Sequence, residues 1–290
     1  MRIKAFILKL LAVKWTIGFI DNDLESIISG KTLNIHWIKH SYSDRWFADP
    51  FILDVTETEI ILLCEEYYYP IKRGRIAKLI IDRKSYELKE SQVVLELETH
   101  LSFPAILRKG NDVYIYPENS KKSKLTFYQY DVRHNQCIKC EDWIEEPLTD
   151  AIVTEIFGEK MIFSTKLPNQ NKNILDVYHW EKEKWVELAS IKFSDNMARN
   201  AGDFFIVNDE VYRPAQDCNK VYGGAVILQK VTKALEFKFV NIRRIESDNS
   251  RYNVGCHTFN HYKGYTVVDA QGYKYPLIAS TLMFIRNMLK

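Results

Sequence analysis

The amino-acid sequence predicts an all-β protein, a five-bladed β-propeller with short helical extensions at its N- and C-terminal ends. Two observations lead to this prediction. Short β-rich runs, broken by Gly, Pro, Asn and Asp, dominate from residue 45 to residue 270, where helical periodicity is scarce. A strand–hairpin–strand plan also recurs five times along that stretch. We expect all of it to belong to a single domain covering residues 1–290.

The repeated units begin near residues 49, 103, 150, 202 and 257. Their expected first strands are 48–53, 102–107, 149–154, 201–207 and 256–260, and their second strands are 59–66, 112–118, 160–165, 210–213 and 264–269. Third strands follow in the first four units only, at 75–82, 124–131, 174–180 and 224–230. The interval of about 50 residues suits a four-stranded propeller blade. A β-sandwich is the alternative, but it gives no reason for one plan to recur at one period.

The charge balance and cysteine content exclude several classes of protein. With 40 Lys+Arg and 38 Asp+Glu the net charge is +2, so no bulk field attracts nucleic acid. Five unevenly spaced cysteines argue against a disulfide framework and for a reducing compartment. Cys137 and Cys140 have zinc-like spacing but lack a second ligand pair, and no glycine-rich nucleotide loop is present. We expect no cofactor and no metal, although Asp49, Glu66 and Asp150 could hold a divalent cation if they lie close together.

The two ends of the chain are apolar and basic. Lys4, Lys9 and Lys14 divide the first apolar segment into pieces too short to span a bilayer. A signal peptide would also need a longer apolar run and a small-residue cleavage site. Residues 277–290 have apolar positions at helical spacing, which suits a helix packed on the domain or one lying on a membrane surface. We expect a cytoplasmic protein, which could also contact the inner membrane peripherally through its two ends.

Propeller geometry predicts where the chemistry lies. The first strand of each blade lines the central channel, so the residues that open these strands surround one mouth of it. The ends of the second strands add to the same ring. Polar groups that are distant in sequence converge there, as they do in ligand pockets. The predicted ring contains Asp49, Glu65, Glu66, His100, Glu118, Asp150, Arg199, Asp203, Arg213, Gln216, Asp217, His257 and Asp269.

Three carboxylates of this ring are candidates for catalysis. Asp49 and Asp150 occupy equivalent positions on blades one and three, which favours a shared acid–base site, and Glu118 is the third candidate. Aspartates also cap turns that lead into strands, and for Asp150 that interpretation stays open. Asp49 lies beside Trp46 and Phe47, which favours a functional role for it.

The segment RPAQDCNKVYGG, residues 213–224, gathers a cation, an amide, a carboxylate and an aromatic ring. We expect Arg213, Gln216 and Asp217 to form a clamp for sugar and phosphate at the mouth. Tyr222 would offer a flat face to a pyranose or a base, and the two glycines would allow close backbone approach.

Four further residues complete the predicted substrate site. Arg199 would join Arg213 over the mouth, because paired guanidinium groups suit phosphate oxygens. An ion network with Asp203 and Asp217 is the alternative for both arginines.

The other three are Glu66, His100 and His257. Glu66 could recognise a hydroxyl or transfer a proton. His257 could donate to a phosphate or act as a base near neutral pH. His100 is a binding candidate that could equally be structural.

The opening ADPF (48–51), the five units and Asp150 resemble the five-bladed glycosidases of the family-43 and family-32 type. That resemblance implies an Asp on blade one, an Asp on blade three and a Glu that opens blade four, which together cleave glycosidic bonds. Here blade four opens with MARNAG, residues 197–202, which has no Glu at the place of the general acid.

A second resemblance covers most of the chain. Its motifs, in order, are WFADPF (46–51), EE…GRI (65–76), HLSFP (100–104), YPENS (116–120), LTDAIV (148–153), ARNAG (198–202), RPAQDCNKVYGGAV (213–226) and GCHTFN (255–260). They are similar to the N-terminal-type domain of glucosamine inositolphosphorylceramide transferases, a domain also found alone in bacteria among surface-polysaccharide genes. The resemblance implies sugar transfer or sugar binding, and it fixes neither donor nor acceptor.

These observations lead to one hypothesis and two alternatives. The hypothesis is a glycosyltransferase of surface polysaccharide or glycolipid biosynthesis. It would use a nucleotide- or lipid-phosphate-linked sugar donor and a glycan acceptor, with Asp49 as the base. The first alternative is a glycoside hydrolase in which Glu118 or Glu66 replaces the absent acid. The second is a non-catalytic propeller that binds glycans.

Overall fold

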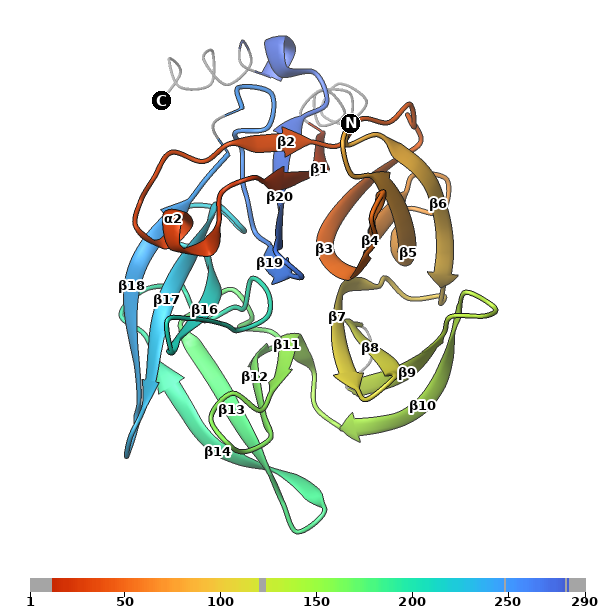
Figure 1. Cartoon of the computed structure of the whole chain (residues 1–290). Coiled ribbons are helices and arrows are strands. Elements are labelled where there is room, and N and C mark those ends of the chain that lie inside the picture. The colour runs from red at the N-terminus through yellow and green to blue at the C-terminus, as the bar shows by residue number, and fades with distance from the viewer. Residues whose placement is uncertain (1–11, 120–123, 248, 280, 282–290) are drawn as a thin grey trace, which may run out of the picture.

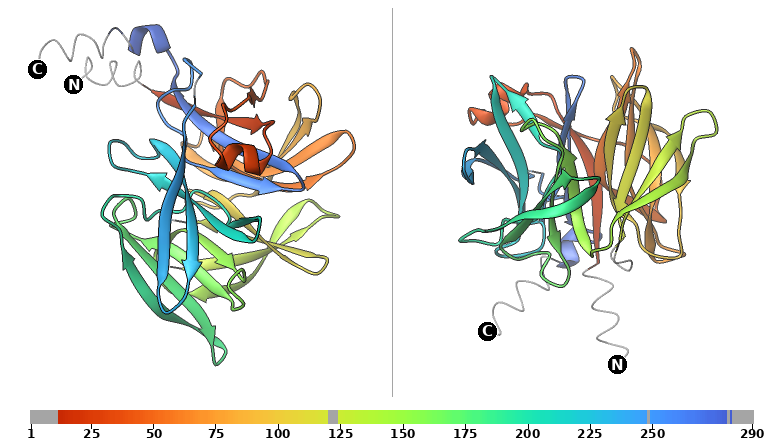
Figure 2. Two further views of the ribbon diagram at one scale, coloured as in Figure 1. Left: turned by 60° about the vertical axis from the view of Figure 1, so that its left-hand side comes forward. Right: turned by 90° about the horizontal axis from the view of Figure 1, so that it is seen from below.

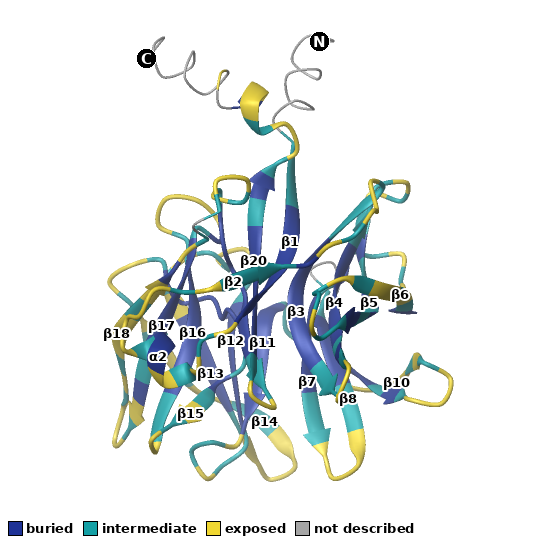
Figure 3. Cartoon of the chain, turned by 45° about the horizontal axis from the view of Figure 1, so that its top comes forward, coloured by how far each residue is buried: buried dark blue, intermediate teal, exposed yellow. Residues whose placement is uncertain are grey.

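The structure is a computed structural model that describes residues 12–119, 124–247, 249–279 and 281. Its strands form five four-stranded sheets, which stand as blades around a common centre (Figure 1). This arrangement confirms the predicted all-β fold and the five-bladed propeller. Buried residues concentrate in the strands, and exposed residues lie mainly in the turns that connect them (Figure 3).

Each blade is an antiparallel sheet of strands that follow one another in the chain, except at the closure. Blade one holds β3 (Arg45–Val55), β4 (Glu59–Tyr68), β5 (Arg73–Asp82) and β6 (Leu88–Leu95). Blade two holds β7 (Ser102–Lys109), β8 (Asp112–Glu118), β9 (Leu125–Asp131) and β10 (Gln136–Ile144). Blade three holds β11 (Leu148–Thr154), β12 (Met161–Lys166), β13 (Ile174–Glu181) and β14 (Lys184–Lys192). Blade four holds β15 (Phe205–Val207), β16 (Glu210–Asp217), β17 (Ala225–Lys233) and β18 (Phe237–Ile245).

Blade five closes the ring by joining the two ends of the chain. It holds β19 (Phe259–Tyr262) and β20 (Tyr265–Tyr273) together with β1 (Val13–Ile20) and β2 (Ile35–Trp37). Strand β1 pairs with β20 along its whole length, and the two strands lie side by side in Figure 2. The sequence had indicated only two strands for this blade. The missing two come from the other end of the chain.

The terminal extensions are described only in part. Most of the expected N-terminal extension, residues 1–11 with Lys4 and Lys9, lies outside the described residues, as do residues 282–290 of the C-terminal one. Two short helical pieces are described, α2 (Leu24–Ile28) and residues 276–279. Among the described residues, no helix has the length and apolar character needed to cross a membrane.

The first three inner strands share a backbone irregularity close to where each repeat begins. Asp49 of β3, Phe103 of β7 and Asp150 of β11 have φ angles of 50°, 45° and 46°, and the pairing register of each strand shifts beside them. In blade four, Gly202 has a φ of 155° in the segment that leads into β15. Such bulges re-aim side chains, at a cost of about 1–3 kcal/mol for a residue other than glycine.

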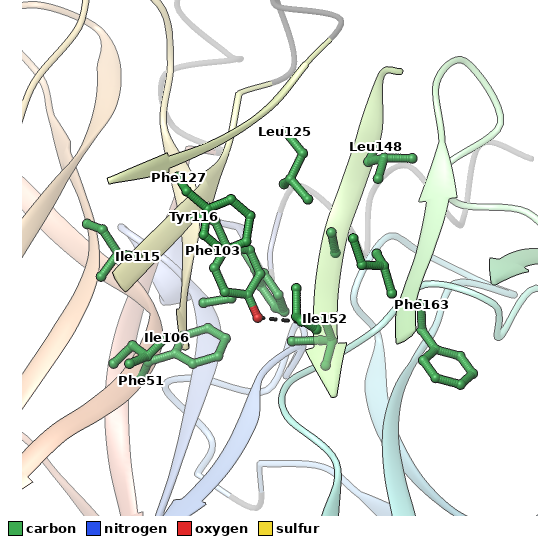
Figure 4. Close-up of a cluster of buried hydrophobic side chains, with 14 of the residues drawn as sticks. Phe51, Phe103, Ile106, Ile115, Tyr116, Leu125, Phe127, Leu148, Ile152 and Phe163 are labelled. Atoms are coloured by element: carbon green, nitrogen blue, oxygen red, sulfur yellow. Dashed lines mark hydrogen bonds between the residues drawn. The ribbon is translucent and has the colours of Figure 1, made fainter. Parts of the chain in front are cut away.

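Apolar side chains pack between neighbouring blades. Within blade two, Tyr116 of β8 stacks on Phe127 of β9 with ring centroids 4.6 Å apart. The Tyr116 hydroxyl also accepts a hydrogen bond from the backbone N–H of Val153 at 3.1 Å, drawn as the dashed line in Figure 4. Phe103 meets Phe51 edge to face at 5.0 Å, which joins blades one and two. This packing fixes the relative positions of the inner strands, and hence of the residues that open them.

Candidate active site at the channel mouth

Asp49 lies in the bulge of β3 and is 5% exposed. Its Oδ2 accepts a hydrogen bond from the backbone N–H of Phe103 at 3.0 Å, and its Oδ1 accepts one from the Thr258 hydroxyl at 2.9 Å. Burial raises the pKa of Asp49 to about 7, against the opposing charge of nearby His257. A carboxyl group with a pKa near neutrality is suited to take a proton from a substrate at physiological pH.

His257 stands next to Asp49 as a buried cation. Its Nδ1 lies 2.7 Å from Oδ2 of Asp269 and 3.7 Å from Oδ1 of Asp49, and Trp15 of β1 stacks on its ring with centroids 3.9 Å apart. Burial alone would lower the pKa of His257, but the two carboxylates raise it to about 9. A ring that is already protonated at neutral pH can donate to an anion. It cannot act as the base that we had also considered.

Arg199 joins the two other carboxylates. Its Nε donates to Oδ2 of Asp150 at 2.6 Å, its Nη2 donates to Oε2 of Glu118 at 3.1 Å, and its Nη1 donates to Oδ1 of Asn171 at 2.8 Å. Burial raises the pKa of Glu118 well above its ordinary value, although Arg199 opposes this. The group therefore contains a guanidinium cation beside a Glu118 carboxyl that holds its proton more tightly than an exposed carboxyl does.

Gln216 and Tyr222 connect these residues to each other. The Nε2 of Gln216 donates to Oδ2 of Asp150 at 2.7 Å, while its Oε1 is buried and has no hydrogen-bond partner among the described residues. The Tyr222 ring lies 5.0 Å from the Arg199 guanidinium carbon and 5.5 Å from the His257 ring, and the residue is 42% exposed. An unbroken set of contacts therefore runs from Glu118 to Asp49.

We call this set the mouth cluster. It consists of Asp49, Glu118, Asp150, Arg199, Gln216, Tyr222 and His257. All seven residues were candidates on the sequence alone. The structure brings them together from all five blades, on strands and on the loops that open or follow them.

Arg213 does not reach the mouth, contrary to the prediction. It is fully buried inside blade four, where Nε donates to Oδ1 of Asn200 at 2.8 Å, Nη1 donates to Oε1 of Gln229 at 2.7 Å and Nη2 donates to the Ala198 carbonyl. Burial lowers the pKa of Arg213 to about 9. Side chains alternate along a strand, so Arg213 and Gln216, three positions apart on β16, point to opposite faces.

Glu66 is also placed differently from the prediction. It is fully buried within blade one, between Arg45 at 2.8 Å and Arg75 at 2.6 Å. Two guanidinium groups satisfy its charge, so it offers no free carboxylate to a substrate. Its neighbour Glu65 lies on the other face of β4, where its charge adds to the rise in the pKa of Asp49.

The remaining predicted residues lie at the edge of this site or beyond it. Asp217 pairs with Arg244 of the outer strand β18, so it does not form the expected clamp. His100 accepts a hydrogen bond from the Gly74 N–H through Nδ1, and its Nε2 lies 3.2 Å from Glu65. His100 therefore connects blade one to the segment that leads into β7.

Three contributors were missed by the sequence reasoning. Thr258 holds Asp49, Asn171 holds Arg199, and Trp15 covers His257. Thr258 follows His257 directly in the GCHTFN motif, so it could have been found there. Trp15 reaches the site only because β1 closes blade five, and no local pattern signals that contact.

Asp49, His257 and Asp269 have ligand atoms within 4.8 Å of one another, close enough to hold a metal ion. Asp269, however, already accepts four hydrogen bonds. They come from the backbone N–H groups of Asp49, His257 and Thr258 and from the His257 ring. A metal would have to displace several of them. Asp269 is therefore better suited to hold Asp49 and His257 in position than to coordinate a metal ion.

Comparison with known proteins places this architecture in a family. Residues 34–272 match the family described as glucosamine inositolphosphorylceramide transferase 1, N-terminal. Glucosamine inositolphosphorylceramide transferase 1 of Oryza sativa subsp. japonica is 26% identical over 215 residues, which cover 69% of this chain and 28% of that protein. The protein of the same name from Arabidopsis thaliana is 25% identical over 199 residues, covering 64% of this chain and 26% of its own length. The matched part thus spans only about a quarter of these relatives.

Solved structures share the fold at low sequence identity. An exo-β-1,3-galactanase from Phanerochaete chrysosporium superposes with a TM-score of 0.55 at 9% identity, covering 75% of this chain and 54% of that one. A GH43_1 enzyme from Xanthomonas citri gives a TM-score of 0.54 at 8% identity, covering 79% and 88%. These similarities establish only that the chain shares the propeller fold. Because the family match takes in most of the sequence, the chain belongs to the family described as glucosamine inositolphosphorylceramide transferase 1, N-terminal.

Proposed function

We propose that this chain transfers a sugar from a phosphate-activated donor to a hydroxyl group of a glycan or glycolipid acceptor, in surface polysaccharide or glycolipid synthesis. The observation that carries the proposal is the environment of Asp49, a buried carboxylate with a pKa raised to about 7 beside a buried imidazolium. The family relationship adds support, since the relatives from Oryza sativa and Arabidopsis thaliana are named as transferases of this kind.

In the proposed reaction Asp49 accepts the proton of the acceptor hydroxyl. The acceptor oxygen forms a bond to the anomeric carbon as the bond from that carbon to the phosphate oxygen breaks. The electron pair of the broken bond stays on the phosphate, which leaves as an anion. A positioned base of this kind typically contributes a factor of 10²–10⁴ to the rate.

Arg199 suits the departing phosphate. Its hydrogen bonds to Asp150, Glu118 and Asn171 use three of the five N–H donors of the guanidinium group. Blade four thus brings a cation to the place where the glycosidase resemblance implied an acid. Preorganised positive charge favours a reaction that develops negative charge on a phosphate.

Hydrolysis of a glycosidic bond is the second candidate, and Glu118 is the observation that favours it. Burial raises the pKa of this carboxyl group well above its ordinary value, so it could protonate a leaving oxygen. Glu66, the other acid considered for that role, is held by two arginines and is not suited to it.

The test replaces Asp49 with Asn and compares transfer with that of an Asp176→Asn control. Asp176 is also buried, at 6% exposure, but it lies on β13 and binds Ser190 away from the mouth cluster. Nucleotide sugars and lipid-linked sugars would be screened by thermal shift, and products identified by mass spectrometry. We expect the Asp49→Asn variant to lose at least about 100-fold in kcat and the control to keep its activity.

Three results separate the candidate functions. Equal turnover by the Asp49→Asn and Asp176→Asn variants would rule out Asp49 as the base. Release of free sugar from aryl glycosides, abolished by Glu118→Gln, would instead establish hydrolysis. Glycan binding without any turnover, unaffected by loss of Asp49 or Asp150, would identify a binding domain.

A further inference from the structure

A cavity of about 410 Å³ opens directly beside the mouth cluster. Its walls come from the loop that follows β12, residues 168–172, and the loop that follows β16, residues 218–222. Tyr222 lines the cavity with its ring 5.0 Å from the Arg199 guanidinium carbon, and Asn171 lines it while accepting the hydrogen bond from Arg199. A ligand in this cavity would therefore contact the residues that hold Arg199.

The lining of the cavity is polar and positively charged. Lys172 and Lys220 are exposed at its walls, and no Asp or Glu lines it. Neither lysine forms an ion pair with any described residue, unlike Lys166, which pairs with Glu146, and Lys263, which pairs with Asp54. Two unneutralised ammonium groups in one concavity attract an anion.

Amide side chains add hydrogen-bond donors and acceptors of fixed direction to the two charged lysines. Gln170, Asn171, Asn196 and Asn219 all line the cavity. The Oε1 of Gln170 is buried and makes no hydrogen bond among the described residues, so it needs a donor such as a sugar or ribose hydroxyl. Ammonium groups together with amides suit a ligand that carries both phosphate oxygens and hydroxyl groups.

The backbone of the cavity is held in place by bonds across its base. The N–H of Asn196 donates to Oδ1 of Asn219 at 3.0 Å, and the N–H of Cys218 donates to the Asn196 carbonyl at 2.9 Å. The Nδ2 of Asn219 donates to Asp217 at 2.7 Å. Such a prearranged site loses little conformational entropy when it binds a ligand.

We infer that this cavity, which we call the lysine pocket, binds the diphosphate group of the sugar donor. The inference rests on the proposed function and deepens it by assigning the diphosphate to Lys172 and Lys220. The oxygen that links the diphosphate to the sugar would then point past Tyr222 toward Arg199, which places the anomeric carbon beside Asp49. A nucleoside diphosphate and a lipid diphosphate share this chemistry, and binding data can separate them.

The first experiment measures binding of inorganic pyrophosphate, uridine diphosphate and farnesyl diphosphate to the full chain by titration calorimetry. The test variant is Lys172→Ala/Lys220→Ala. The matched control is Lys192→Ala/Lys238→Ala, which removes two exposed lysines that form no ion pair among the described residues and line none of the described cavities.

We expect the test variant to bind all three probes at least 10-fold more weakly, and the control to bind them like the unaltered chain. Tighter binding of uridine diphosphate than of pyrophosphate would indicate a nucleotide donor, and tighter binding of farnesyl diphosphate a lipid donor. Failure of the unaltered chain to bind any probe, or equal binding by both variants, would overturn the inference.

Cys218 provides an independent readout inside the pocket. It lines the cavity, whereas Cys140 is exposed on β10 of blade two. Saturating pyrophosphate should slow alkylation of Cys218, followed by peptide mass spectrometry, and leave Cys140 unchanged. Alkylation of Cys218 at the same rate with and without pyrophosphate would contradict binding in this pocket.

The inference and the proposed function can fail separately. If Asp49→Asn abolishes transfer but Lys172→Ala/Lys220→Ala keeps both binding and turnover, the function stands and the lysine pocket is wrong. If the lysine variant loses diphosphate binding while Asp49→Asn retains turnover, the pocket stands and the role of Asp49 is wrong.

Discussion

Adjacent residues in this protein have opposite roles, and the difference follows from strand geometry. Glu65 and Glu66 are neighbours on β4, yet Glu66 is bound by Arg45 and Arg75 inside blade one while Glu65 faces the mouth. Sequence alone identifies the strand and its acids. The face that each residue occupies depends on the pairing register, and a shift of one position reverses it.

The pairing of His257 with Asp269 and Asp49 makes stability depend on pH. The folded pKa of His257 is about 9, above the ordinary value of 6.5, so the folded state binds the proton more tightly. The stabilisation is therefore complete below about pH 6.5 and is lost as pH rises through about 9. Asp49 also has a raised pKa in the folded state, about 7, so its contribution to stability is lost as the pH rises from about 4 to 7.

We predict that His257→Gln flattens the upper part of this pH dependence. At pH 6 the variant should be less stable than the unaltered chain by up to about 3 kcal/mol, and the difference should shrink toward pH 9. Urea denaturation at a series of pH values measures this. His134→Gln is the control, since His134 pairs with Asp131 at the surface with its side chain 69% exposed. Parallel curves for His257→Gln and the unaltered chain would contradict the account.

At the scale of the strand, the repeated bulge explains why the two aspartates were predictable. Asp49 and Asp150 occupy the same bulge position in β3 and β11, and a recurring period in the sequence is enough to align them. Arg213 was misplaced because the sequence indicated that the strand ends at residue 213, whereas β16 continues to Asp217 and Arg213 points to the opposite face from Gln216. Trp15 and the strand β1 could not be predicted locally, because they complete a blade whose other strands lie at the far end of the chain.

The segment that leads into β15 should tolerate no side chain at Gly202. A Cβ atom on Gly202 would lie 2.0 Å from the Phe259 carbonyl oxygen and 2.6 Å from Oδ1 of Asn260, at a φ of 155°. We predict that Gly202→Ala lowers the free energy of unfolding by more than about 3 kcal/mol. The control is Gly110→Ala, whose Cβ would meet nothing within 4 Å at a φ of 61°, and which should cost about 1 kcal/mol. Similar losses for both variants in equilibrium denaturation would show that the contact of blade four with blade five is not close.

At the scale of the whole molecule, side-chain hydrogen bonds close the ring of blades. Asn260 of blade five donates to the Pro50 carbonyl of blade one at 2.9 Å and accepts from the N–H of Asp203 in blade four at 2.8 Å. Asn200 similarly donates to the carbonyls of Asp150 and Phe163. These bonds keep the inner strands in register, which the mouth cluster requires because its members come from different blades.

We predict that Asn260→Ala costs about 2–4 kcal/mol of unfolding free energy, since it leaves the buried Pro50 carbonyl and the part-buried Asp203 N–H without partners. Asn22→Ala is a matched control, because Asn22 also makes two hydrogen bonds to the backbone, but at the surface and within one loop. Its loss should cost under about 1 kcal/mol. Chemical denaturation of both variants checks this, and equal costs would mean that Asn260 does not bridge the blades.

The most direct test of the central claim is a crystal structure of the chain with a bound sugar diphosphate. The account predicts the diphosphate at Lys172 and Lys220, its sugar-linked oxygen toward Arg199, and the anomeric carbon beside Asp49. It would be contradicted by a ligand seated elsewhere, above all in the larger cavity of about 860 Å³ between blades two and three, which is lined by Trp143, Lys160 and Asp203.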